Sequence, residues 1–186
     1  MLVGIDETSV VWSLFLTVGV PLIVILFYFD GMVIGKVLPP GAIFVGYVTI
    51  FRPDGIVLLL VSAAAVLATT LGQWTLYRGF NDRSPEFFGI RRRIPGLKRL
   101  PLKIKGRLGP KRMAIVTSLF ERFGGPALTV VNIVPGIRCL ITIPAGLSRY
   151  PVRRFLLYST IGNTIYVVLL VGIARGILEI ADAIRL

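Results

Sequence analysis

Long apolar runs constrain this chain more than any other feature of its sequence. Residues 10–29 are 20 positions without a charge, and residues 55–77 add 23 more. Twenty residues of α-helix rise about 30 Å, the thickness of the hydrocarbon core of a bilayer. With a third apolar run at 152–174, they predict an all-α polytopic membrane protein with about three full transmembrane helices. A hydrophobic share of 55% agrees with that class.

Two further apolar stretches are interrupted by Pro-Gly pairs. Residues 30–55 contain Pro40-Gly41, and residues 126–146 contain Pro135-Gly136. Each apolar piece is too short to span, and irregular backbone at membrane depth is tolerated only inside protein or against water. We therefore predict two oppositely oriented re-entrant hairpins. The spans that follow them contain weakly similar segments, LGQWTLY and IGNTIY, as in an inverted repeat.

Charge places the chain relative to the membrane. Residues 78–112 hold 12 Lys or Arg and two acids, which predicts a basic cytoplasmic loop that attracts anionic lipid rather than nucleic acid. This loop divides a single membrane domain, 1–186, into halves at 10–77 and 113–186. The first run would then cross outward from a cytoplasmic N-terminus in the plasma membrane. Residues 113–123 and the tail after residue 174 read as short amphipathic segments.

The composition argues against catalysis. The chain has no histidine and one cysteine, so zinc sites with histidine ligands, imidazole bases and internal disulfides are not expected. No pairing of a nucleophile with a base is visible. We expect neither an enzyme nor a cofactor or metal site, with proton or ion coupling as the open possibility. Oligomeric state is not indicated.

Arg138 is a full charge inside the second interrupted stretch. Ionisable groups inside a membrane indicate function by default. A Pro-Gly tip frees backbone amides, and Arg138 would lie in the first turn of the half-helix that follows Gly136. Amides, dipole and guanidinium together favour a carboxylate or phosphate. A purely structural ion pair with Asp30 is the alternative.

These motifs resemble the DedA family, also called the VTT or SNARE-associated Golgi protein family, over roughly residues 30–176. The resemblance rests on Pro135-Gly136-Ile137-Arg138, the following Ala145-Gly146, and Asp30 before Pro40-Gly41. The chain departs from the family pattern at three positions. The family has an acid where this chain has Ala42, an arginine where it has Asn132, and an aspartate where it has Gln73. Because an acid and a base are missing together at positions 42 and 132, the resemblance suggests that those two charges were partners.

The resemblance implies movement of lipids between leaflets, by a flippase or scramblase acting on polyprenyl phosphate or phospholipid head groups. The expected substrate-binding residues are Arg138, Asp30, Asn132, Pro135, Gly136, Pro40, Gly41 and Arg154. Membrane lipids with anionic phosphate head groups would be the partners. A proton- or ion-coupled transporter of small solutes and a non-transporting scaffold remain alternatives.

Overall fold

The computed structural model describes residues 18–32, 39–81 and 110–184. Its elements in chain order are α2 (Val20–Gly31), α3 (Pro40–Phe51), α4 (Gly55–Phe80), α6 (Pro110–Phe123), α7 (Gly125–Ile133), α8 (Thr142–Leu147) and α9 (Val152–Ile184). No strand occurs in these ranges, so the predicted all-α class is confirmed there. Most of the predicted basic loop, at 82–109, and the start of the first run, at 10–17, lie outside the described residues.

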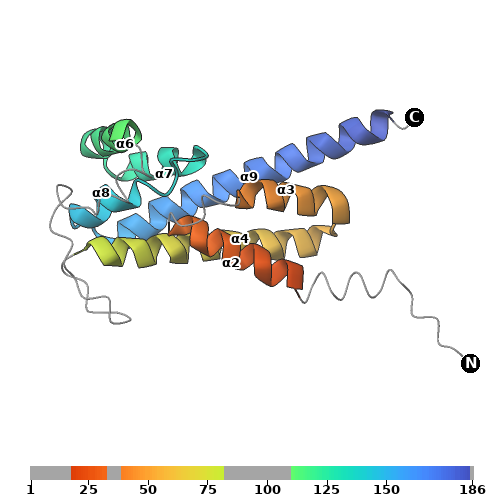
Figure 1. The fold of residues 1–186 in the computed structure, drawn as a ribbon, viewed down its shortest axis with the longest axis horizontal. Coiled ribbons are helices and arrows are strands. Elements are labelled where there is room, and N and C mark those ends of the chain that lie inside the picture. The colour runs from red at the N-terminus through yellow and green to blue at the C-terminus, as the bar shows by residue number, and fades with distance from the viewer. Residues whose placement is uncertain (1–17, 33–38, 82–109, 185–186) are drawn as a thin grey trace, which may run out of the picture.

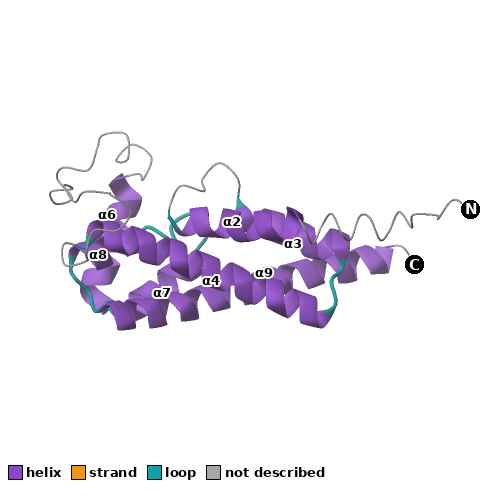
Figure 2. Cartoon of the chain, turned by 90° about the horizontal axis from the view of Figure 1, so that it is seen from below, coloured by secondary structure: helices purple, strands orange, loops and turns teal. Residues whose placement is uncertain are grey.

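Two long helices, α4 and α9, form the axis of the molecule and lie side by side (Figure 1, Figure 2). Among the described helices, α4 is the one that meets the length and composition of a membrane span. Its 26 residues rise about 39 Å. Large apolar side chains lie exposed along both helices, among them Leu59, Leu60, Val168 and Leu169. A surface of this kind suits contact with lipid.

The first half places a helical hairpin, α2 and α3, against these long helices. Figure 1 shows α2 running in the same direction as α4 and α3 running back. Phe27 of α2 meets Phe44 of α3 edge to face, with ring centroids 5.9 Å apart. Gly31 and Gly72 allow close approach of α2 and α4, because a Cβ on Gly72 would collide with the carbonyl oxygen of Tyr28.

The second half repeats this layout from the other end of the molecule. α7 packs on α9, where a Cβ on Gly162 would lie 2.7 Å from the Cβ of Asn132. The chain then turns at Pro135-Gly136, and α8 packs on α4, where a Cβ on Gly146 would lie 2.8 Å from the Cβ of Phe80. The ends of the two hairpins therefore meet near the middle of the α4–α9 pair.

The first half differs from expectation in its direction. We expected residues 10–29 to run opposite to residues 55–77, but α2 runs parallel to α4. Pro21 lies in the first turn of α2, where a proline fits without a kink. α2 thus ends at the middle of α4 and serves as one arm of the hairpin. The hydrophobic pattern could not show this, because it is the same for either direction of travel.

A smaller expectation, for the tail, is also corrected. The tail is no separate stub, because α9 continues to Ile184. No proline occurs between Pro151 and Ile184 to break this helix. The guanidinium of Arg52 pairs with Asp182 at 2.7 Å, which holds the end of α9 against the turn between α3 and α4. Near the other end of the molecule, Tyr77 is fully buried; its ring stacks on Phe155 and its hydroxyl donates to the carbonyl of Tyr150.

Candidate functional site

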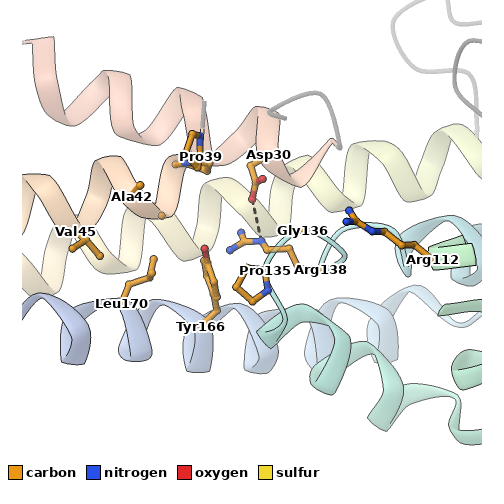
Figure 3. A pocket seen from close by; sticks show the side chains of 12 residues that line it. Asp30, Pro39, Ala42, Val45, Arg112, Pro135, Gly136, Arg138, Tyr166 and Leu170 are labelled. Atoms are coloured by element: carbon orange, nitrogen blue, oxygen red, sulfur yellow. Dashed lines mark ion pairs between the residues drawn. The ribbon is translucent and has the colours of Figure 1, made fainter. Parts of the chain in front are cut away.

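A cavity of about 530 Å³ lies where the two hairpin ends meet (Figure 3). It is bounded by the end of α2, the start of α3, the turn after α7, and the middle of α9. Six of the eight site residues expected from the sequence line it: Asp30, Pro40, Gly41, Pro135, Gly136 and Arg138. Both Pro-Gly pairs therefore reach one cavity from opposite ends of the molecule.

An ion pair joins the halves inside this cavity. Nε of Arg138 lies 3.0 Å from Oδ2 of Asp30, and the two side chains are 5% and 22% exposed. Asp30 occupies the last turn of α2, where the helix dipole disfavours a negative charge, so the guanidinium offsets an otherwise unfavourable placement. The pair with Asp30 that the sequence offered as the structural alternative is therefore present.

Arg138 keeps donor capacity beyond this pair. Its Nη2 donates to Oγ1 of Thr69 at 3.2 Å, while Nη1 is buried and has no hydrogen-bond partner among the described residues. Buried donors are normally satisfied, and an unmade bond to a charged group costs more than one to a neutral group. Because Arg138 lines the cavity, an acceptor inside the cavity could bond this donor.

Tyr166 is a member of the site that the sequence reading missed. The guanidinium carbon of Arg138 lies 4.0 Å from the centroid of its ring, a cation–π contact. Its hydroxyl lies against Gly41, where a Cβ would come within 2.5 Å. The periodicity of α9 marks Tyr166 as a buried position but cannot show which charge lies beneath the ring.

The local structure around Arg138 corrects the expected half-helix. Residues 135–140 form successive turns, with Gly136 at φ +81°, and α8 begins only at Thr142 and has six residues. Arg138 is therefore held by turns and lies outside any first helical turn. The first hairpin does present a helix start to the cavity, because α3 begins at Pro40. Its dipole adds a partial positive charge there.

A buried cluster of three carboxamides lies beside Arg138 and links α4, α7 and α9. Oγ1 of Thr70 donates to the carbonyl of Val66, so it accepts from Nδ2 of Asn163 at 3.1 Å. The same Nδ2 donates to Oε1 of Gln73 at 3.0 Å. Nε2 of Gln73 then faces Oδ1 of Asn132 at 2.8 Å. One hydroxyl thus determines the orientation of all three amides.

This cluster shows which side chain Asn132 contacts. Asn132 bonds Gln73, so the two positions at which the family motif has arginine and aspartate are in contact with each other. Ala42 lines the cavity instead, near Asp30 and Arg138. Asn132 itself is fully buried beside the cavity wall. The loss of an acid at position 42 therefore removes negative charge from the cavity itself.

Arg154 is not brought to the site. It is exposed near the start of α9 and precedes Tyr166 by 12 residues, about 18 Å along the helix. The cavity is lined instead by another arginine, Arg112 of α6. Its position just before the second half was visible in the sequence, but nothing in the pattern indicated that α6 would carry it to the cavity.

The fold and site define a helical membrane protein with an ion pair held between two opposed helical hairpins. The chain belongs to the VTT domain family, the DedA family that its motifs resemble; the family profile matches residues 38–175. Membership rests on that match, which begins after α2 and covers α3, α4, α6, the second hairpin and most of α9. No solved structure matches the chain.

Three curated relatives give further comparisons. Proteins named alkaline phosphatase-like protein from two Lactococcus lactis strains, MG1363 and IL1403, are 27% and 30% identical over 140 and 141 residues. Each alignment covers 72% of this chain and 59% of the relative. Undecaprenyl phosphate transporter A of Staphylococcus aureus is 37% identical over 60 residues, 32% of this chain and 30% of that protein. The chain thus spans about three-fifths of the first two relatives.

Proposed function

We propose that this protein transports lipids between the leaflets of a membrane and binds their anionic phosphate head groups in the cavity at Arg138. The observation that carries the proposal is the buried guanidinium with an unused donor inside a cavity that also has apolar walls. Guanidinium groups fork onto phosphate oxygens. A relative named for undecaprenyl phosphate transport supports the same substrate class.

In this proposal the two helical hairpins are re-entrant. α4 and α9 cross the bilayer, the first hairpin enters from the side of Phe51, and the second enters from the side of the basic loop, which faces the cytoplasm of the cell. The cavity then lies at membrane depth. A charged head group crosses hydrocarbon slowly because it must lose its water, and Arg138, Tyr166 and the start of α3 would offer a polar alternative.

Asp30 has the role of a competitor in the cycle. When the site is empty, its carboxylate pairs with Arg138; a phosphate that enters displaces it. The cycle needs no cofactor and no covalent chemistry, and Asp30 is the residue on which proton coupling would depend. Transport of a small solute could use the same pair, but the apolar lining residues Val45 and Leu170 favour a lipid.

The test is leaflet exchange in vesicles that hold the purified protein. A labelled polyprenyl phosphate and a labelled phospholipid are followed, with and without a proton gradient. We expect Arg138→Ala to lower exchange at least tenfold and Arg154→Ala, the same change outside the cavity, to leave it intact. Size-exclusion elution and helical content would confirm that both variants are folded.

Either of two results would reject the proposal. Wild-type protein that exchanges neither lipid under either condition would shift the assignment to a small solute or to a scaffold. Exchange that is equal in wild type and folded Arg138→Ala would show that the cavity is not the site. Loss in both arginine variants would point to the net charge of the surface instead of Arg138.

A further inference from the structure

Arg112 gives the cavity a second cation that the proposed function does not use. It lies in the first turn of α6, is exposed, and lines the cavity together with Arg138. Figure 3 shows its side chain on the same side of the site as the turn at Gly136. No ion pair or hydrogen bond joins it to another residue of the described ranges.

The charges that line the cavity are therefore unequal. Among the described residues that line it, two guanidiniums, of Arg112 and Arg138, accompany one carboxylate, of Asp30. Because Asp30 pairs with Arg138, the positive charge left over among these residues is that of Arg112. Ala42 contributes no compensating acid. An anionic head group would balance this charge, whereas the ammonium of a zwitterionic head group would be repelled by it.

The polarity of the cavity lining also differs from one side to the other. Figure 3 shows Arg112 on one side of Arg138, and Val45 of α3 and Leu170 of α9 on the other. A lipid in the cavity would satisfy both ends if its head group lay toward Arg112 and its first tail segments lay between α3 and α9. An amphipathic ligand fits this lining better than a free anion does.

We propose that Arg112 selects anionic over zwitterionic lipid head groups at this site. The inference rests on the proposed function and adds a residue and a selectivity to it. Arg112 would act early, by attracting the head group toward Arg138, so its effect would appear as a ratio of rates between lipids. A direct exposed ion pair between Arg112 and an anionic head group contributes up to about fivefold in affinity.

The experiment measures the exchange of labelled phosphatidylglycerol and phosphatidylcholine with the same acyl chains. The expected result is a wild-type ratio above one that falls about fivefold in Arg112→Gln, chiefly through slower exchange of phosphatidylglycerol. Arg112→Lys should retain most of the ratio because it keeps the charge. Lys111→Gln is the matched control, since Lys111 is the exposed neighbour on α6 and is not among the cavity-lining residues.

The possible failures can be told apart. If wild-type protein exchanges neither these lipids nor the labelled polyprenyl phosphate, the proposed function fails. If it exchanges the polyprenyl phosphate alone, the proposed function stands and the role of Arg112 in selecting among phospholipids fails. If it exchanges both phospholipids but Arg112→Gln leaves the ratio unchanged, only the role of Arg112 fails. An equal fall in Lys111→Gln would assign the preference to general attraction at the surface and would also overturn the inference.

Discussion

The two halves of the molecule have the same helix layout but divide the polar groups of the site between them. In residues 20–80, α2 runs parallel to α4 and touches it at a glycine, and the returning arm α3 packs on α9. In residues 125–184, α7 runs parallel to α9 and touches it at a glycine, and the returning arm α8 packs on α4. Each half therefore completes the packing of the other.

The difference lies in the ends of the hairpins. The first half contributes an acid, Asp30, from a regular helix end, and its returning arm is a helix of 12 residues. The second half contributes a base, Arg138, from a series of turns before a helix of six residues. The site thus exists only where the halves meet.

The largest expected effect comes from breaking the ion pair on the side of the second half. Arg138→Ala leaves Asp30 without its partner at the unfavourable end of α2, and we expect a loss of about 3–5 kcal/mol in the free energy of unfolding. Asp30→Asn should cost less, because the amide oxygen that replaces the carboxylate can still accept a hydrogen bond from the guanidinium. Denaturation in detergent micelles measures both. Equal losses would contradict the asymmetry between the halves.

The carboxamide cluster tests how strongly the halves are joined away from the charges. Asn163→Leu removes the donor to Oε1 of Gln73 and leaves that buried oxygen unsatisfied, at about 1–3 kcal/mol. Adding Gln73→Leu should cost less than the sum of the two single changes, because both partners are then apolar. Additive costs in the same unfolding measurement would show that the two amides act independently.

The glycine contacts compare the two parallel helix pairs directly. Gly72→Ala places a methyl group against the backbone carbonyl of Tyr28, and Gly162→Ala places one against Asn132 and Thr129. Both should destabilise by about 1–3 kcal/mol, with Gly72 the more costly if the backbone there cannot move. Gly172→Ala on α9 is the control, since nothing lies within 4 Å of its Cβ, and it should not destabilise.

Substitutions at the glycines of the two Pro-Gly pairs should have different effects. Gly41→Ala displaces the hydroxyl of Tyr166 and weakens its contact with Arg138, so it should slow lipid exchange while stability changes little. Adding Tyr166→Phe removes the clashing oxygen and should restore part of the rate. Gly136→Ala meets no neighbour but is strained by its positive φ, at about 1–2 kcal/mol of stability. If the variant with both Gly41→Ala and Tyr166→Phe exchanges lipid no faster than Gly41→Ala alone, displacement of the Tyr166 hydroxyl is not the cause of the slower exchange.

Much of the fold was predictable because it depends on local properties. An uncharged run of 23 residues favours one long helix, α4. The Pro-Gly pairs predicted breaks at positions where the structure begins α3 and ends α7. The direction of α2 was not predictable, because an apolar run reads the same whichever way it crosses. Arg154 was expected at the site from the family resemblance, but it lies about 18 Å along α9 from Tyr166 and is not among the residues that line the cavity.

The sequence by itself determined that the chain is helical and apolar, and that Arg138 needs protein or water around it, since the cost of an unshielded charge in hydrocarbon does not depend on the fold. Only the tertiary structure decided which groups surround that charge. Asp30 and Tyr166 come from α2 and α9, and Arg112 from α6. Contacts between distant segments depend on how helices pack, and helix packing is set by glycine positions and side-chain volumes acting together across the whole domain.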